Sequence, residues 1–304
     1  MTSSTRSDPA PPRRLRIVGA ASGVGAQDHE CEHGPVAFHR SQAWHELAHH
    51  PALDWGVTLY APDRPGMSPV ERIAQLCGKL ADEVARTRAA GQFPLVLGGD
   101  HSVAIGTWSG LARSLGAPLG LLWIDAHMDS HTPETSHSDA IHGMPLACLF
   151  GRGDKRLLGF GLPGMQLLPE HTVLLGPRSY EAEEADFLAR LGVRVIGAEE
   201  IGQRGFRETF AEAVGIVQAA PHGFGVTLDL DAFDPCLIPG VGSPEPDGLD
   251  TGAMLEGLRR LGRSPGLLGV EIVEYNPDRD RGGVTADLIA DLVGVLLPPG
   301  KQRN

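Results

Sequence analysis

The sequence predicts an α/β fold in which a mostly parallel sheet is covered by helices on both faces. Short apolar or β-branched runs alternate along the chain with longer segments of helical periodicity. Several of the short runs are apolar throughout, which is typical of strands that are buried on both faces. The chain has 304 residues, of which 41% are hydrophobic, so it is long enough to bury one large core.

Eight short runs are expected to be strands, and four longer segments are expected to be helices. The strands are 16–18, 55–60, 94–97, 119–124, 173–175, 193–196, 225–230 and 267–273. The helices are 69–90, 102–115, 251–261 and a last helix that runs through residue 296. In each helix the apolar residues recur every three or four positions. Thr285 is expected to cap the N-terminus of the last helix.

Composition excludes several classes of function. The formal net charge is −12, which leaves no basic stripe for a nucleic acid or for an anionic membrane surface. No apolar stretch approaches the roughly 20 residues of a membrane-spanning helix. The four cysteines are widely separated and form no CxxC pair, so reduced thiols and a cytoplasmic location are expected. The polar, proline-containing residues 1–14 are expected to form a disordered tail that precedes a single domain, 15–304.

Polar motifs follow four of the expected strands. GGDHS at 98–102, DAHMD at 125–129, DLDAFDP at 229–235 and EYNP at 274–277 all come directly at strand ends. In open α/β sheets, ligands bind outside the carboxyl ends of the strands. These motifs are therefore expected to place several carboxylates and two imidazoles on one rim of the sheet.

The spacing of the acidic residues points to bound metal. Asp125, His127 and Asp129 are two residues apart, which in extended backbone places their side chains on the same side. Asp229 and Asp231 repeat this spacing. So many converging carboxylates would repel one another unless cations neutralised them. Asp100 and Asp234 are instead interpreted as residues that hold turns.

Taken together, these motifs resemble the metal-binding signatures of the arginase and agmatinase family. GGDHS, DAHMD and DLDAFDP occur in the family's order with similar spacing, and HGMP at 142–145 and EIVEYNP at 271–277 add to the likeness. It extends over nearly the whole chain. The resemblance implies a three-layer α/β/α domain with a parallel sheet, and a hydrolase that releases urea from a small cationic guanidino substrate.

The resemblance also implies a ligand set for two Mn²⁺ ions per chain. One ion would be bound by His101, Asp125, Asp129 and Asp229, and the other by His127, Asp125, Asp229 and Asp231. Two such ions can share one water and lower its pKa, so a metal-bridging hydroxide would be the nucleophile. By resemblance Asp129 would relay a proton to the leaving amine, His142 would exchange protons with solvent, and Glu274 would pair with the guanidinium group.

Substrate contacts are implied in the loop after DAHMD and further along the chain. Ser136 and Ser138 align with hydroxyls that bind the substrate carboxylate. Glu181 stands where arginases carry an Asp that pairs with the α-ammonium, and Glu184 matches its acidic neighbour. His131 stands where arginases usually carry an Asn that contacts the substrate carboxylate, so it could replace that contact, bind a different group or leave the site altered; if it points inward it can donate a hydrogen bond to the carboxylate. Asp139 stands where Gly is usual.

L-Arginine is the substrate that these residues favour, with urea and L-ornithine as products. The alternatives are agmatine, another guanidino acid such as guanidinobutyrate, formiminoglutamate, and a metal-loaded binding protein without turnover. HGMPL at 142–146 resembles arginases more than agmatinases. The family likeness also implies a homotrimer or homohexamer.

Two other features are interpreted as structural. Gly23-Val24-Gly25 does not match a dinucleotide-binding motif and is expected to be a loop. Ser109 lies inside a predicted helix and is expected to be a packing residue rather than a nucleophile.

Overall fold

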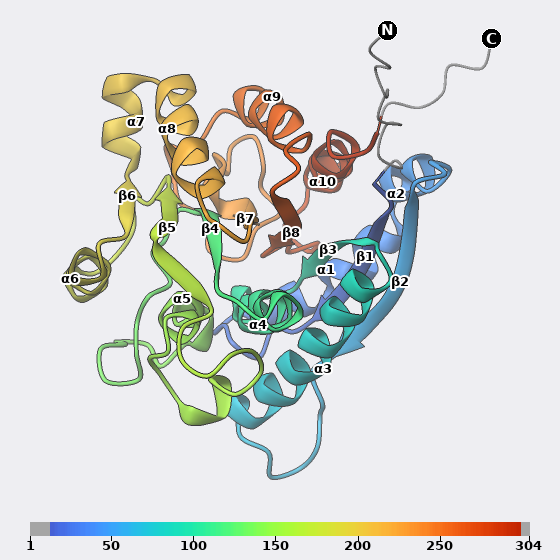
Figure 1. Cartoon of the computed structure of the whole chain (residues 1–304). Helices are drawn as coiled ribbons and strands as arrows, with labels where there is room; N and C mark the ends of the chain where they lie inside the picture. The colour runs from blue at the N-terminus through green and yellow to red at the C-terminus, as the bar shows by residue number, and fades with distance from the viewer. Residues whose placement is uncertain (1–12, 299–304) are drawn as a thin grey trace, which may run out of the picture.

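The centre of the molecule is one eight-stranded sheet. A computed structural model describes residues 13–298, and it contains strands in the order β2-β1-β3-β8-β7-β4-β5-β6 (Figure 1), all paired in parallel. Their bounds are β1 Leu15–Ala21, β2 Leu53–Tyr60, β3 Phe93–Gly98, β4 Leu119–Ile124, β5 Leu167–Leu175, β6 Arg194–Ile196, β7 Phe224–Asp229 and β8 Leu267–Val273. Every expected strand is confirmed. The largest difference is in β5, which begins well before residue 173 because its first residues pair with β4.

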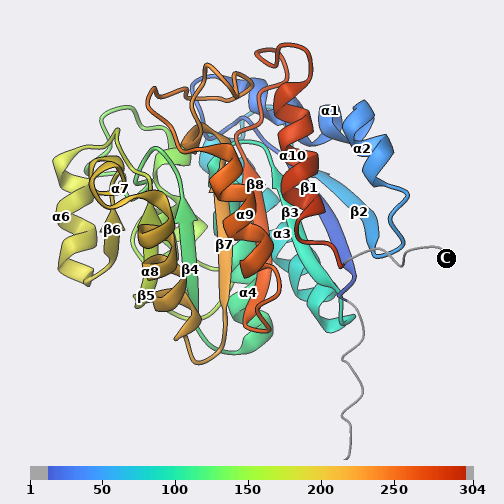
Figure 2. The same cartoon turned by 90° about the horizontal axis from the view of Figure 1, so that it is seen from above.

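Helices cover both faces of the sheet. Their bounds are α1 Gly34–Arg40, α2 Gln42–Leu47, α3 Pro69–Ala89, α4 Ala104–Leu115, α5 Pro145–Leu149, α6 Ala182–Leu191, α7 Ala198–Arg204, α8 Phe206–Gln218, α9 Thr251–Leu261 and α10 Val284–Gly294. Apolar residues of α1, α2, α8, α9 and α10 share one core with the sheet, and those of α3, α4, α5 and α6 share the other. The view in Figure 2 shows the sheet between these two layers. The expected three-layer α/β/α fold is confirmed.

Alternation along the strands divides the core between the two layers. In β3, Leu95 faces the α8–α10 layer and Val96 faces the α3–α4 layer. In β7, Gly225 brings the backbone close to α4, since a Cβ at this position would lie 1.9 Å from the Trp108 ring. Only glycine fits there, so the indole can pack directly against the strand backbone. Thr227 follows on the same face and is completely buried.

The predicted helices differ from the structure mainly at their starts. The start of α3 agrees and carries a capping box between Ser68 and Glu71. The helix expected from residue 102 begins two residues later, because His101–Val103 form a 3-10 turn. The expected cap at Thr285 is wrong. Gly283 is the N-cap residue of α10, and the Thr285 hydroxyl instead accepts a hydrogen bond of 3.0 Å from the backbone N–H of Gly240.

The N-terminal end of the described chain is anchored. Arg13, expected in the tail, donates hydrogen bonds to the carbonyls of Gly262, Ser264 and Leu267, and its guanidinium lies 4.4 Å from the centre of the Phe93 ring. The rest of the expected tail, apart from Arg14, lies outside the described residues. Within residues 13–298, none of the helices combines the length and apolar character needed to cross a bilayer.

The four strands that precede the polar motifs are neighbours. They are β3, β8, β7 and β4, and they occupy the middle of the sheet. Because all strands run in parallel, the motifs at their carboxyl ends meet at one edge. The topology thereby gathers residues that lie as far apart in the sequence as His101 and Glu274, which contact each other through the His101 N–H and the Glu274 carboxylate at 2.9 Å.

Candidate metal centre and substrate cavity

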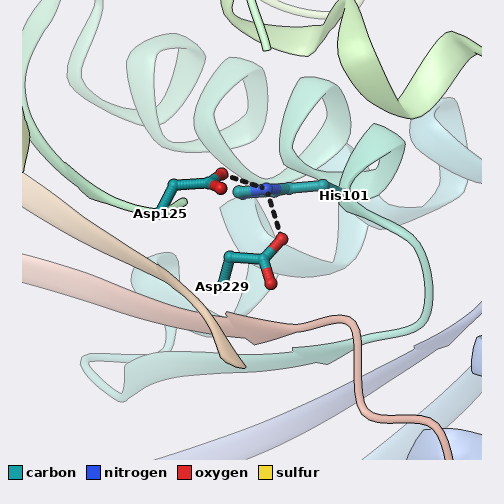
Figure 3. A group of neighbouring side chains, drawn as sticks. All are labelled: His101, Asp125 and Asp229. Atoms are coloured by element: carbon teal, nitrogen blue, oxygen red, sulfur yellow. Dashed lines mark ion pairs between the residues drawn. The ribbon is translucent and has the colours of Figure 1, made fainter. Parts of the chain in front are cut away.

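His101 lies at the centre of the first ligand group. Its Nδ1 is 3.1 Å from Oδ2 of Asp125, 3.0 Å from Oδ2 of Asp129 and 3.1 Å from Oδ2 of Asp229. Figure 3 shows the imidazole between the carboxylates of Asp125 and Asp229. All four side chains are buried. They come from the ends of three strands, β3, β4 and β7, and converge on one point.

His127 lies at the centre of a second group that shares Asp125. Its Nδ1 is 3.1 Å from Oδ2 of Asp231 and 3.4 Å from Oδ1 of Asp125. On its other side, Nε2 of His127 is 3.8 Å from the Glu245 carboxylate. Asp125 therefore directs one oxygen to each imidazole. This is the arrangement expected of a carboxylate that bridges two ions.

The first group fits a metal ion better than it fits a set of hydrogen bonds. Among the described residues, Nδ1 of His101 has no hydrogen-bond partner of acceptable geometry, although three carboxylate oxygens surround it. Ligands about 2.1 Å from an ion lie about 3 Å apart at adjacent octahedral positions, which matches the distances here. Oxygen and imidazole ligands without thiolate suit Mn²⁺ and similar divalent cations. Both His-carboxylate groups could hold a metal ion.

The backbone brings the ligands together differently from what the spacing suggested. The residues after β4 are not extended, because the chain bends at Ala126 and His127, and Asp129 has a left-handed φ of 48°. Asp229 is the last residue of β7, and Asp231 lies in a 3-10 turn, Leu230–Ala232. The expectation of extended ligand segments is therefore wrong. The side chains converge through bends, one of them at a non-glycine residue in a conformation that costs on the order of 1 kcal/mol.

Backbone and side-chain donors fix the carboxylates. The backbone N–H of His127 donates to Oδ1 of Asp125 at 2.7 Å, and the Trp123 indole donates to Oδ2 at 2.8 Å. Asp229 accepts from the N–H of Asp231 at 2.9 Å. The Trp123 ring also stacks on the His101 ring, with centroids 4.3 Å apart. Such outer contacts orient ligands and limit their freedom.

A buried polar chain lies behind His101 on the α4 side of the sheet. The Nε2 of His101 is 3.1 Å from Oγ1 of Thr227, and Thr227 donates to Oε2 of Glu271 at 2.7 Å. Thr107 of α4 donates to the other Glu271 oxygen. Because the Thr227 proton goes to Glu271, its oxygen is free to accept from His101, which places the imidazole proton on Nε2. The lone pair of Nδ1 then faces the carboxylates, as metal binding requires.

Burial and mutual repulsion perturb the acidic groups. Burial and the charges of Asp231 and Asp125 raise the pKa of Asp229 well above its usual range. Burial, followed by the charge of Asp125, raises the pKa of Asp129 to about 6. Burial opposes charge on His101 and His127 as well, but the surrounding carboxylates outweigh it and raise the pKa of each imidazole. Divalent cations would replace these protons and relieve the repulsion.

Glu274 lies beside the first group and is held from several directions. It follows β8 with a left-handed φ of 64°. Its Oε1 is 3.0 Å from Nδ1 of His142, and its Oε2 accepts from the Cys31 thiol at 3.2 Å. A Cβ at Gly242 would lie 2.3 Å from Oε2, so this position must be glycine for the carboxylate to fit. Burial disfavours the charged form of Glu274, but His142 outweighs it and lowers the pKa of Glu274.

These residues line a cavity of about 190 Å³ at the carboxyl edge of the sheet. Its inner wall contains His127 and Glu274 together with the carboxylates Asp129, Asp229 and Asp231, whereas His101 and Asp125 lie buried behind it. Its outer wall contains five of the residues expected from the sequence to contact substrate: His131, Ser136, Ser138, Glu181 and Glu184. Four residues that the sequence did not single out also line it: His137, Ala140, Ser179 and Ser243. The last two come from distant loops and follow no motif, so no local signal marks them.

His131 is engaged by protein groups at both ring nitrogens. Its Nδ1 is 3.1 Å from Oγ1 of Thr135, and its Nε2 is 3.0 Å from Oε2 of Glu181 and 3.4 Å from Oε2 of Glu184. Because both ring nitrogens already contact protein groups, neither is free for the direct contact with a substrate carboxylate that was one of the possibilities for His131. Burial raises the pKa of Glu184 to about 7, whereas the hydrogen bond from His131 lowers the pKa of Glu181.

The chain matches known proteins over most of its length. The model of the Arginase family matches residues 13–297. The chain belongs to the arginase family. The arginase of Bacillus caldovelox is 33% identical over 292 residues, which cover 93% of this chain and 97% of that protein. The crystal structure of arginase from Bacillus subtilis has a TM-score of 0.85 and 31% identity, covering 95% of this chain and all of that one.

A further arginase structure shares the fold. It is the Entamoeba histolytica arginase in complex with L-ornithine, with a TM-score of 0.84 and 26% identity over 93% of this chain.

Asp139, which stands where glycine is usual, has a left-handed φ of 57°. This explains why glycine suits the position, and aspartate is among the residues that tolerate it.

The residues interpreted as structural do have structural roles. Asp100 accepts from the backbone of Gly25 and Ser102, and Asp234 accepts from the backbone of Cys236. Gly23–Gly25 form a loop, where a Cβ at Gly23 would meet the His29 carbonyl at 2.1 Å. Ser109 is buried within α4.

Proposed function

We propose that this chain hydrolyses L-arginine to urea and L-ornithine with two Mn²⁺ ions per chain. In this reaction water adds its oxygen to the guanidinium carbon, the bond from that carbon to the side-chain nitrogen breaks, and the leaving amine takes a proton. A guanidinium cation and water thus become urea and an alkylammonium ion. The proposal is supported most directly by the imidazole and carboxylate groups around Asp125, which offer two adjoining cation sites in one cavity.

Six residues would hold the ions: His101, Asp125, His127, Asp129, Asp229 and Asp231. Their oxygen and nitrogen donors favour Mn²⁺ over structural zinc, whose sites are commonly rich in thiolate. Two such ions would lower the pKa of a shared water enough to supply the nucleophile near neutral pH. The protein itself would keep the carboxylates away from solvent. It would also fix the orientation of Asp125 through hydrogen bonds from the Trp123 indole and the backbone N–H of His127.

The proton transfers would involve Asp129 and His142. The pKa of Asp129 is raised to about 6 by burial and by Asp125, which suits a carboxylate that accepts a proton and passes it to the leaving amine. His142 lies on the cavity wall with its side chain 24% exposed, so it can exchange protons with solvent. Glu274 would supply the negative charge that pairs with the guanidinium group deep in the cavity.

The outer wall would bind the amino-acid end of the substrate. Glu181 and Glu184 offer negative charge to an ammonium group, and Ser136 and Ser138 offer hydroxyls to a carboxylate. The names of the relatives support arginine, since those matched at about a third identity are arginases. We also propose a trimeric or hexameric assembly in the cytoplasm, by likeness to the family and from the widely spaced cysteines.

The test is urea release from a panel of guanidino compounds by protein loaded with Mn²⁺, Co²⁺ or Zn²⁺. L-Arginine should be hydrolysed with L-ornithine as the second product, and the Mn²⁺ protein should be the most active. Preference for agmatine would overturn the arginine assignment and keep the hydrolase. Release of formamide from formiminoglutamate would instead identify the protein as a formiminoglutamate hydrolase, which does not release urea. Absence of products from every compound would leave a metal-binding protein without turnover.

A further inference from the structure

His131 occupies the position between the two carboxylates of the outer wall. Its Nε2 lies 3.0 Å from Glu181 and 3.4 Å from Glu184, and the ring is only 8% exposed. An ammonium group that bound both carboxylates would need the same place. A substrate ammonium must therefore displace the imidazole or accept a poorer contact.

The carboxylates are already supplied with donors. Glu184 accepts the backbone N–H of Ser130 at 3.0 Å on Oε1 and that of Glu181 at 3.1 Å on Oε2. Glu181 accepts from His131. A buried or half-buried acid whose hydrogen-bonding capacity is used within the protein gains less from a ligand cation than a free one does. Buried Glu184 thus has a donor on each oxygen before any substrate enters, and the 46% exposed Glu181 side chain has His131 on one oxygen.

The His131 ring is also held in this orientation. The Thr135 hydroxyl lies 3.1 Å from Nδ1, and Thr135 itself accepts the backbone N–H of Thr132 at 2.9 Å. Because carboxylates only accept, Nε2 carries a proton, which points at Glu181 and Glu184. Rotating the ring away would break both contacts at once.

The remaining outer wall offers hydroxyl donors to a substrate carboxylate. Among the described residues that line the cavity there is no lysine or arginine, and the lining includes the hydroxyls of Ser136, Ser138 and Ser243. Hydroxyls can donate to a carboxylate without demanding a neighbouring ammonium. A guanidino acid with an acidic far end and no α-ammonium would meet the metal centre at one end and these donors at the other.

We propose that His131 takes the place of a substrate α-ammonium, so that the cavity also hydrolyses ω-guanidino carboxylic acids that lack this group. The chemistry is the same as for arginine: water adds to the guanidinium carbon, the carbon–nitrogen bond breaks, and urea and an ω-ammonium acid form. The inference rests on the proposed function. It makes His131 a residue that determines specificity.

The experiment compares 5-guanidinopentanoate, which is arginine without its α-ammonium, with L-arginine. The wild-type Mn²⁺ enzyme should hydrolyse both with kcat/KM values within about tenfold of each other. His131→Asn removes the Nε2 donor and frees both carboxylates. It should lower KM for L-arginine and shift the kcat/KM ratio toward arginine by about tenfold or more, which corresponds to about 1.4 kcal/mol.

Two further variants separate the imidazole's role from simple loss of structure. His131→Gln can place an amide N–H near the position of Nε2, so it should keep the wild-type ratio more closely than His131→Asn does. His137→Asn removes an imidazole whose ring centre lies 6.1 Å from that of His131, and it should leave the ratio unchanged even if both rates change together. Binding of the products, L-ornithine against 5-aminopentanoate, measured by calorimetry, should show the same shift without turnover.

Several results would overturn the inference. If the wild type hydrolyses arginine but not 5-guanidinopentanoate, or if His131→Asn leaves both the kinetic and the calorimetric ratios within about twofold of wild type, His131 does not replace the ammonium. Failure of the proposed function is different: no guanidino compound would then release urea, and the inferred activity would fall with it.

Discussion

Nδ1 of His142 lies 3.0 Å from Oε1 of Glu274, so an imidazole on the cavity wall and a carboxylate at the end of β8 share one contact. Burial opposes charge on His142, but the hydrogen bond and charge of Glu274 outweigh it and raise the pKa of His142 to about 9. The residue that would exchange protons with solvent is thus tied to the residue that would pair with the guanidinium group.

The stability of the metal-free protein should depend on pH through this pair. The pKa of His142 rises from an ordinary 6.5 to about 9 on folding, so its contribution is fully present below pH 6.5 and is lost as pH rises through 9. Urea unfolding with chelator should therefore show wild type more stable than His142→Asn by on the order of 2 kcal/mol at pH 6. The difference should vanish above pH 9. A difference that does not change with pH would contradict this coupling.

His142→Asn should retain two metal ions but lose turnover. His142 belongs to neither ligand group, so elemental analysis should match wild type. Its proposed proton exchange is typically worth about 100-fold in rate, so kcat for urea release should fall by roughly that factor. His45→Asn, on the exposed surface of α2, is the matched control and should keep full activity. Full activity of His142→Asn at every pH would show that His142 does not exchange protons with solvent during the reaction.

Asp229→Ala should impair both metal positions. Asp229 contacts His101 directly and supports Asp231 through the Asp231 N–H, so its removal affects both groups. Wild type should bind two Mn²⁺ per chain at saturation, and the variant should bind at most one. Asp234→Ala is the control from the same motif, because Asp234 holds only a turn, and it should still bind two. Elemental analysis that found a single ion in saturated wild type would argue against a binuclear centre.

Thr227→Val should weaken one metal ion without removing any ligand. Valine matches the shape of threonine but cannot accept from Nε2 of His101 or donate to Glu271. Loss of such an outer contact typically costs 10–100-fold in metal affinity, and calorimetric titration with Mn²⁺ should show this for one ion only. Thr227→Ser keeps the hydroxyl and should restore affinity. Equal affinity in the valine and serine variants would mean that the tautomer of His101 is set by something else.

The sheet was predictable largely because its central strands β3, β4, β7 and β8 are buried along their whole length and appear as mainly apolar runs. The position of the site followed from the polar residues at the ends of β3, β4, β7 and β8, since parallel strands place those ends together. The location of Thr227 next to the site could also have been predicted from the sequence. It lies two residues before Asp229 in the same strand and therefore on the same face.

Other features depend on contacts that no local pattern reports. Helices α1, α2, α5, α6, α7 and α8 were not assigned from the sequence. The bend after β4 and the left-handed φ of Asp129 occur at residues whose spacing equally suits an extended strand. The pairing of His131 with Glu181 joins positions 50 apart, and that of Cys31 with Glu274 joins positions 243 apart. These are set by how loops pack across the edge of the sheet, which depends on the whole fold.

The four strands whose ends carry the site residues lie in the middle of the sheet, and this affects how the proposed metal centre would be lost on heating. Strands β3, β8, β7 and β4 are each hydrogen-bonded to a neighbouring strand on both sides. Their amide hydrogens should therefore exchange with solvent only when the whole sheet opens. The loop at 130–141, which carries the outer wall of the cavity, has no such pairing along its length and can open locally. Heat should therefore erode substrate selectivity first, and metal retention should persist until cooperative unfolding removes the strands that position its ligands.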